Sequence, residues 1–277
     1  MRVLKTVKEL SSFRDTIQKG KNVALVPTMG NLHDGHISLV KKAKQDNDVI
    51  CVSIFVNPTQ FGPNEDFNKY PRTFDEDLEK LSKVDCDVVF VPSVSEMYPN
   101  GVDNVFVTER SRSKGLCGKY RPGHFDGVLT VVLKLLNICK PNKAYFGMKD
   151  YQQLVLIKEM LRSLNMDIEV IPCSLVRESD GLAMSSRNSY LSKEDRKKAL
   201  KINYSINKIN ELFISGVTNV EQLKRLGLEN LMPEINVQYI DIVDKDTLTT
   251  VKNAKKGDIV AISGFCGNVR LIDNITL

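Results

Sequence analysis

Short apolar segments rich in Val, Ile and Phe recur through the first two thirds of the chain, and the residues between them follow a helical spacing. The apolar segments are residues 22–27, 48–57, 87–92, 143–147 and 168–174. They show little alternation of apolar and polar residues, which is typical of strands in a parallel sheet that helices cover on both faces. We therefore predict a buried strand in each.

The segments between the strands predict helices. Apolar residues lie three and four positions apart in residues 36–45, 73–83 and 150–164, which indicates amphipathic helices. Residues 125–139 are nearly all apolar and too long for one strand, so we expect a helix that is buried on most sides. Alternating strands and helices predict a doubly wound, Rossmann-like α/β domain with a parallel sheet, in which ligands bind beyond the carboxyl ends of the strands.

The pattern changes after about residue 176. A loop rich in Ser, Gly and charged residues leads into two helical segments, residues 192–214 and 219–231, and then into three strand-like runs. This order predicts a second, smaller α+β domain. We place the α/β domain at residues 1–175 and a smaller lid domain at residues 176–277, with a possible hinge in the loop between them.

Composition and charge narrow the class of protein. With 277 residues, 42% hydrophobic and 26% charged, the chain has the composition of a folded globular protein. The formal net charge of +5 comes from 39 basic and 34 acidic residues, without a long block of like charge. We therefore expect anionic small molecules as partners and no nucleic acid.

Cysteine usage and hydropathy bear on the compartment. The six cysteines include no CxxC pair, and four lie within or next to apolar runs, which favours buried free thiols. The N-terminal residues lack the apolar core of a signal peptide, and no apolar run approaches the roughly 20 residues of a membrane span. We expect a cytoplasmic protein that does not contact a membrane.

Two of the three histidines, His33 and His36, follow the first predicted strand, and the next predicted helix begins at His36. Free backbone N–H groups and the helix dipole favour a phosphate there, and Gly30 and Gly35 allow a close approach of the backbone. Two imidazoles could stabilise charge that grows on the phosphate. A capping or core histidine pair is one alternative. A metal site is another, but no further ligand for zinc is evident nearby.

Other polar groups follow strands or precede helices. Gln60 and Asn57 come after the second strand, where amides could bind the hydroxyls of a small polar substrate or form an ordinary turn. His124 and Arg121 precede the apolar helix and could attract an anion, whereas Asp126 could simply cap that helix.

Two later segments could bind a nucleotide. Lys149 can reach phosphate oxygens, and Asp150 can cap the following helix or accept from a ribose hydroxyl. Ser185, Ser186 and Arg187 lie in the boundary loop, which could close over a triphosphate or be an ordinary solvated loop. Neither a GxxxxGK[ST] loop nor a GxGxxG after the first strand is present, which disfavours a P-loop ATPase and a dinucleotide dehydrogenase.

These motifs carry a resemblance to a known family. HDGH, from His33 to His36, resembles the HxGH signature of the nucleotidyltransferase superfamily, and MSSR, from Met184 to Arg187, resembles its KMSKS-type loop. Longer segments are similar to the pantoate–β-alanine ligase family over essentially the whole chain: PTMGNLHDGH, SIFVNPTQF, YPRTFDEDL, RPGHFDGVLTVVLKLLNI and FGMKDYQQLVLI.

The resemblance implies an activity and partners. The family condenses pantoate with β-alanine, using ATP and magnesium. Pantoate is first adenylylated, with release of pyrophosphate, and β-alanine then displaces AMP. No protein nucleophile is needed, because positioning and charge stabilisation suffice. The family also implies a homodimer.

The resemblance also implies roles for individual residues. The catalytic residues would be His33, His36, Lys149 and Arg187. The ATP site would comprise Pro27, Thr28, Met29, His36, Gly147, Met148, Lys149, Asp150, Val176, Met184, Ser185, Ser186 and Arg187. The pantoate site would comprise Met29, Phe55, Asn57, Gln60, Val131 and Gln153.

The chain departs from the family pattern at two places. The family commonly has Glu at the position of Met148. The acidic residues of FDEDLEKL differ in detail from those of relatives that bind metal there. We therefore expect no protein metal site, and magnesium that arrives with ATP and keeps mostly phosphate and water ligands.

Two other functions are possible from the sequence. One is a transferase that moves AMP or CMP onto a phosphorylated acceptor, although the amide pair Gln60 and Gln153 favours an acceptor with carboxylate and hydroxyl groups. The other is a nucleotide-binding regulatory module without turnover.

Overall fold

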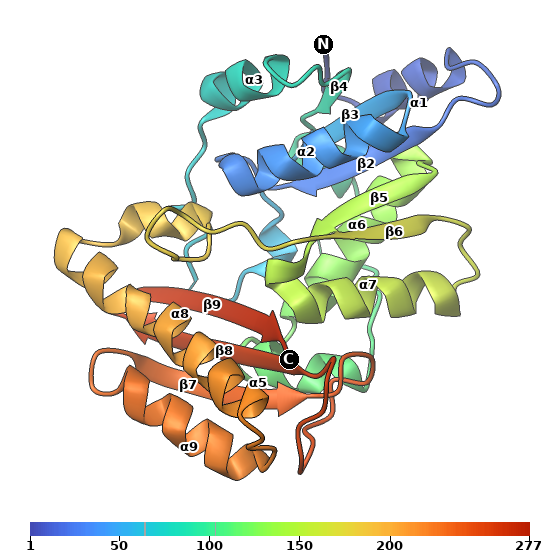
Figure 1. The fold of residues 1–277 in the computed structure, drawn as a ribbon. Coiled ribbons are helices and arrows are strands. Elements are labelled where there is room, and N and C mark those ends of the chain that lie inside the picture. Colours follow the sequence, from blue (N-terminus) through green and yellow to red (C-terminus); the bar gives the residue numbers. More distant parts are fainter. Residues whose placement is uncertain (64, 103) are drawn as a thin grey trace. The chain divides into compact units, whose positions relative to one another are not determined.

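The fold of the chain is described from a computed structural model (Figure 1). The structure describes residues 1–63, 65–102 and 104–277. These residues form two compact units. The first unit comprises residues 1–109, 121–148 and 153–174, and the second comprises residues 110–120, 149–152 and 175–277. The second unit thus takes in two short segments that the sequence pattern assigns to the α/β domain.

The first unit contains a parallel sheet of six strands in the order β1-β4-β3-β2-β5-β6. Its strands are β1 (Arg2–Leu4), β2 (Val23–Thr28), β3 (Val49–Ile54), β4 (Val88–Phe90), β5 (Lys143–Gly147) and β6 (Glu169–Cys173). The helices are α1 (Val7–Asp15), α2 (Asp34–Asp46), α3 (Phe74–Ser82), α4 (Val94–Met97), α6 (His124–Cys139) and α7 (Tyr151–Ser163). The first two residues of α7 belong to the second unit. This order confirms the predicted doubly wound domain.

Strand alternation explains how both faces of the central strands are covered. Ala24 and Val26 of β2 share one apolar core with Val40 of α2 and Leu81 of α3. Successive side chains of a strand point to opposite faces. Leu25 therefore faces the other side of the sheet, where it is also fully buried. Figure 1 shows α2 in front of the sheet and α6 behind it.

The edge strands differ from the prediction. Most of β6 is exposed or half-buried, so its prediction as a buried strand is wrong in that respect. It pairs only with β5, and such an edge position tolerates Pro172. The opposite edge strand, β1, was not predicted, because three residues are too short a segment for the hydrophobic pattern to identify.

The register brings the ends of β2 and β3 together. Val23 lies opposite Val49, and the pairing continues in step to Thr28 opposite Ile54. The N–H of Phe55 then donates to the Thr28 carbonyl oxygen at 3.1 Å. The loops that follow the two strands therefore begin side by side at the carboxyl edge of the sheet.

The second unit is built on an antiparallel sheet of three strands, which confirms the predicted smaller α+β domain. Its strands are β7 (Asn236–Val243), β8 (Ile259–Cys266) and β9 (Val269–Thr276), and its helices include α5 (Leu116–Tyr120), α8 (Lys193–Ile214) and α9 (Val220–Leu231). Ile202 and Ile206 of α8 and Leu223 of α9 share an apolar core with Val260 and Ile262 of β8.

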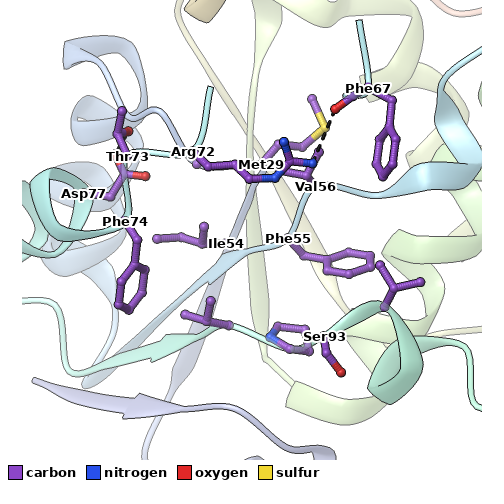
Figure 2. Close-up of a pocket in the computed structure, with 14 residues that line it drawn as sticks. Met29, Ile54, Phe55, Val56, Phe67, Arg72, Thr73, Phe74, Asp77 and Ser93 are labelled. Carbon is purple, nitrogen blue, oxygen red and sulfur yellow. Dashed lines mark hydrogen bonds between the residues drawn. The ribbon is translucent and has the colours of Figure 1, made fainter. Parts of the chain in front are cut away.

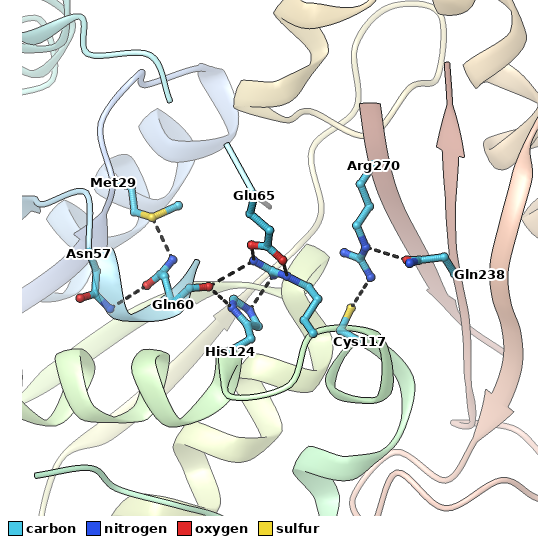
Figure 3. Close-up of polar contacts among 9 residues, drawn as sticks. Met29, Asn57, Gln60, Glu65, Cys117, His124, Gln238 and Arg270 are labelled. Carbon is cyan, nitrogen blue, oxygen red and sulfur yellow. Dashed lines mark hydrogen bonds and ion pairs between the residues drawn. The ribbon is translucent and has the colours of Figure 1, made fainter. Parts of the chain in front are cut away.

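Polar contacts explain why two distant segments join the second unit. The Cys117 thiol lies 3.1 Å from the Tyr239 hydroxyl and accepts from Arg270 at 3.4 Å (Figure 3). The Asn274 amide donates to the Lys149 carbonyl oxygen at 2.8 Å. These partners are more than a hundred residues apart in the chain, so local sequence patterns could not reveal them.

Two general properties follow from the described part of the chain. None of its helices is both long and apolar enough to cross a membrane. All six cysteines carry free thiols, and all except Cys117 are buried.

A carboxylate in the second unit makes stability depend on pH. The N–H groups of Thr247 and Asp246 donate to Asp244 and lower its pKa from 3.8 to about 2. The stabilisation is present above about pH 4 and is lost as the pH falls towards 2, because the folded state holds the carboxylate ionised. We expect Asp244→Asn to cost on the order of 1 kcal/mol near neutral pH, since solvent screens this half-buried group.

Urea unfolding of both proteins near pH 7 and near pH 3 measures this effect. Asp246→Asn is the matched control, because only its backbone takes part in the turn. A difference between wild type and Asp244→Asn that does not shrink at acid pH would contradict the assignment.

Candidate active site

The two histidines lie at the junction between β2 and α2. His33 is the N-cap of α2, and the chain reaches it through Gly30 and Asn31, whose φ angles of 80° and 49° lie in the left-handed region. Both histidines are half-buried. Their ring centroids are 4.0 Å apart. The structure therefore places two closely spaced imidazoles, tilted by 33° to one another, at the positive end of a helix dipole, where an anion is stabilised.

A backbone contact fixes the ring of His36. The N–H of His33 donates to Nδ1 of His36 at 3.3 Å. A ring nitrogen that accepts carries no proton, so Nε2 of His36 is the protonated nitrogen of the neutral ring. The capping role that the sequence left open is therefore real. It also makes Nε2 a hydrogen-bond donor.

The loop before His33 rests on α3. The carboxylate of Asp77 accepts from the N–H of Asn31 at 2.9 Å and from that of Leu32 at 2.7 Å. Burial raises the pKa of Asp77 above its ordinary value, and these two N–H groups oppose that rise. The Lys80 ammonium donates to the Leu32 carbonyl oxygen at 2.7 Å. Asp77 and Lys80 are not among the site residues that the sequence predicts.

Asn57 and Gln60, the predicted substrate-binding amides, belong to a connected hydrogen-bond network (Figure 3). The Asn57 amide donates to Oε1 of Gln60 at 3.2 Å and to the Gly127 carbonyl oxygen at the same distance. The Tyr98 hydroxyl donates to Oδ1 of Asn57 at 2.8 Å. Because Oε1 of Gln60 accepts, its Nε2 is the donor, and it points to the Met29 sulfur at 2.9 Å. Asn57, 1% exposed, therefore supports the orientation of Gln60.

At the predicted anion site of Arg121 and His124, the guanidinium group is already paired with a carboxylate. Arg121 forms a two-pronged ion pair with Glu65, at 2.7 and 2.6 Å. Burial raises the pKa of Glu65, but the Arg121 hydrogen bonds and charge outweigh it, so the net shift is downward. Arg121 also donates to Nε2 of His124 at 2.8 Å, and the other ring nitrogen of His124 then donates to the Gln60 carbonyl oxygen at 2.8 Å. This network holds the backbone of Gln60.

The helix start near His124 also differs from one sequence alternative. Gly123, with a φ of 78°, is the N-cap of α6, and Asp126 lies in the first turn. The suggestion that Asp126 caps this helix is therefore wrong, because the left-handed backbone that opens the helix favours glycine.

Gly127 of α6 allows the amide loop to sit against the helix. A Cβ atom at this position would lie 2.2 Å from the Thr59 carbonyl oxygen and 2.7 Å from the Gln60 nitrogen. Only glycine permits so close an approach. Sequence reasoning missed this role, since nothing in the local pattern shows which loop packs on α6.

A cavity of about 330 Å³ opens at the carboxyl ends of the strands (Figure 2). Its walls are mainly apolar, with Met29, Phe55 and Phe67 among them, and Arg72 is the one basic side chain among the described residues that line it. Of the predicted pantoate residues, Met29 and Phe55 line this cavity. Val131 is buried on α6, and Gln153 is half-buried in the first turn of α7, and neither lines the cavity.

The remaining residues of the first unit that the resemblance assigns to ATP lie at strand ends. Pro27 and Thr28 end β2, and the Thr28 hydroxyl donates to the Ser53 carbonyl oxygen at 2.7 Å. Gly147 ends β5, and Met148 follows it. Nothing in the structure explains why Met148 replaces the Glu that is common in the family.

The other ATP residues belong to the second unit. The N–H of Met184 donates to the Val176 carbonyl oxygen at 3.0 Å, which pairs the two residues across a short hairpin. Ser185 caps the 3-10 helix Ser186–Tyr190, with its hydroxyl oxygen 3.2 Å from the N–H of Arg187. Lys149 and Asp150 precede α7. The segment that bears Ser185 to Arg187 is thus folded locally, with these three residues half-buried.

The donors of the site suit anions better than cations. Asp77 directs both carboxylate oxygens at backbone N–H groups, and its neighbours Asp75 and Glu76 are exposed. Among the described residues, no three His, Cys, Asp or Glu side chains gather as metal ligands. A hard cation prefers oxygen ligands, which the phosphates of a bound nucleotide would supply to magnesium.

The fold and the site together define a class of protein. A doubly wound parallel sheet with a histidine pair at the N-terminus of a helix on its carboxyl edge is typical of a domain that binds nucleotide phosphates. The sequence model described as pantoate-beta-alanine ligase matches residues 2–276. The chain therefore belongs to the pantoate–β-alanine ligase family, and it is an enzyme.

Similar proteins cover the whole chain. The pantothenate synthetase of Fervidobacterium nodosum is 52% identical over 100% of this chain and 99% of its own length. The crystal structure of the Thermus thermophilus pantothenate synthetase has a TM-score of 0.94 and 42% identity, and covers 99% of both chains. The Francisella tularensis ligase, described as complexed with β-γ ATP and β-alanine, has a TM-score of 0.83 and 39% identity, with 100% and 97% covered.

Gly127→Ala tests the packing of the amide loop on α6. The added methyl group meets backbone atoms that cannot turn away, so we expect a loss of about 1–3 kcal/mol in unfolding free energy. Gln60 moves with the loop, and therefore we also expect a raised KM for pantoate. Urea unfolding and steady-state kinetics measure the two effects.

Gly115→Ala is the control for this substitution, since a Cβ atom there meets nothing within 4 Å and φ is −88°. Equal stability and KM for the two alanine variants would contradict the proposed packing constraint.

Proposed function

We propose that the enzyme joins pantoate to β-alanine at the expense of ATP, through an enzyme-bound pantoyl adenylate, and releases pyrophosphate and AMP. The observation that carries this proposal is the histidine pair at the N-terminus of α2, beside a loop that presents an oriented amide donor. Family membership and the Francisella complex with a nucleotide and β-alanine support it.

The first step needs charge stabilisation. A pantoate carboxylate oxygen attacks the α-phosphorus of ATP, and the bond to the oxygen that bridges to the β-phosphate breaks. Negative charge grows on the phosphate oxygens, and pyrophosphate leaves. The N–H groups that open α2 and the Nε2–H of His36 would stabilise that charge, because they are oriented before the reaction starts.

The second step needs positioning. The amine of β-alanine attacks the acyl carbon of pantoyl adenylate, the amide bond forms, and AMP leaves with the former carboxylate oxygen. The amine loses its proton to solvent or to the departing phosphate. Holding the two reactants in place can supply most of the acceleration, so no side chain need act as a nucleophile.

The binding roles of other residues are part of the same proposal. The amide of Gln60, with that of Gln153, would bind the hydroxyl and carboxylate oxygens of pantoate. Met29, Phe55 and Val131 would pack against its methyl groups. Lys149, Ser185, Ser186 and Arg187 would bind phosphate oxygens, and Gly147 and Asp150 would hold the ribose. Pro27, Thr28, Met148, Val176 and Met184 would complete the ATP site.

Magnesium would be held by the phosphates and by water. In that position it would neutralise part of the triphosphate charge and so make pyrophosphate a better leaving group. We also infer that the enzyme is a homodimer, as expected of this family. We further infer that it works in a reducing compartment such as the cytoplasm, which suits six free thiols.

Pyrophosphate release tests the two-step reaction. With ATP, magnesium and pantoate alone, we expect about one equivalent of pyrophosphate per active site, because the adenylate stays bound. Addition of β-alanine should make release continuous. Other short hydroxy acids serve as controls. A protein that binds ATP but releases no pyrophosphate with pantoate would contradict the proposal and favour the binding-module alternative.

His36 can be tested apart from its capping role. His36→Ala removes the ring donor and the cap, and we expect pyrophosphate release to fall about 10²–10³-fold. His36→Glu supplies a new acceptor for the His33 N–H, as in an ordinary capping box, but offers no donor.

The Glu variant should therefore be as stable as wild type and as inactive as the Ala variant. Thermal unfolding and single-turnover assays decide this. An active His36→Glu enzyme would show that only the cap matters.

A further inference from the structure

Helix α3 contacts the turn before the histidines through two side chains one helical turn apart. Asp77 accepts from the N–H of Asn31 and of Leu32, one for each carboxylate oxygen, and Lys80 donates to the carbonyl oxygen of Leu32. Thr73, at the start of the same helix, donates to Asp77 at 3.2 Å. Figure 2 shows Thr73 and Asp77 together on one wall of the cavity.

The turn has a backbone that needs such support. Gly30 and Asn31 are both left-handed, and a side-chain-bearing residue rarely adopts that conformation. The turn directs the N–H groups of Asn31 and Leu32 at the same carboxylate. Leu32 is only 2% exposed, so its N–H would lack a water partner if the carboxylate were absent. An unsatisfied buried N–H is costly.

The Asp77 carboxylate is buried against the turn. Asp77 is 1% exposed, which is unusual for a charged residue. A Cβ atom on Gly30 would lie 3.1 Å from its Oδ2, so the turn lies directly against it. Both carboxylate oxygens accept from the backbone, and the nearby Lys80 ammonium compensates the buried charge.

We propose that Asp77, assisted by Lys80, is a positioning residue for the catalytic histidines. It fixes the backbone of Asn31 and Leu32, and the next residue, His33, is the N-cap that carries one ring and orients the other. This inference rests on the proposed function, since it assumes that His33 and His36 stabilise the adenylylation transition state. Asp77 acts through the backbone and does not touch the reacting atoms.

Asp77→Asn is the informative substitution, because it keeps the size of the side chain. An amide has one acceptor oxygen, so one backbone N–H of the turn faces an NH₂ group and loses its hydrogen bond. Asp75→Asn is the matched control, since Asp75 is exposed on the same helix. Lys80→Met removes only the donor to Leu32. It tests whether α3 holds the turn if Asp77→Asn folds poorly.

Two readouts are needed, one of which does not depend on turnover. Amide hydrogen exchange of Asn31 and Leu32, resolved by NMR, reports the hydrogen bonds. Steady-state pyrophosphate release reports kcat and the KM values for pantoate and magnesium. In Asp77→Asn we expect faster exchange at the amide that loses its hydrogen bond, that of Asn31 or of Leu32, and a kcat lowered on the order of tenfold to a hundredfold. Both KM values should stay close to wild type, and Asp75→Asn should match wild type throughout.

Several results would overturn the inference. Unchanged exchange in Asp77→Asn and Lys80→Met would show that α3 does not hold the turn. Faster exchange with a wild-type kcat would show that the turn does not position the histidines. A raised magnesium requirement would assign Asp77 to metal binding instead. If wild type itself releases no pyrophosphate with pantoate, the proposed function fails, and with it the catalytic part of this inference, while the exchange data still decide whether Asp77 holds the turn.

Discussion

The turn between β2 and α2 is the constraint on which the site depends. Within six residues the chain leaves a buried strand, reverses through two left-handed residues and opens a helix whose first N–H groups have no partner within the helix. The histidine cap and the Asp77 carboxylate satisfy part of this backbone. The same N-terminus gives the site its preference for anions. The hydrogen bonding of this backbone and the proposed binding of phosphate therefore depend on the same few residues.

Much of the fold could be predicted because the central strands and helices have strong local patterns. The ends of β2, β3 and α6 lie within a few residues of the predicted ones. The weaker points have physical causes. Strand β6 pairs on one side only, and so its partly exposed surface contradicts the buried pattern. Residues 110–120 join the second unit through contacts with β7 and β9, which no local spacing reveals.

The candidate site could be predicted as a set of residue types at strand ends, but not as a network. The sequence placed His33 and His36 at a helix start, and the structure shows them there. It could not show that Arg121 is paired with Glu65, or that His124 braces Gln60. Nor could it show that Gly127 admits a loop from elsewhere in the chain. These features depend on tertiary contacts between distant segments, and a local sequence pattern does not reveal such contacts.

In the proposed reaction, the carboxylate of pantoate becomes the acyl group of an adenylate at this site. Turnover of pantoate labelled with ¹⁸O in both carboxylate oxygens tests it most directly, with mass spectrometry of the products. We expect AMP to carry one labelled oxygen and pantothenate to keep the other. AMP without label, formed together with pantothenate, would rule out an adenylate intermediate, because the carboxylate would then never have been joined to the α-phosphate.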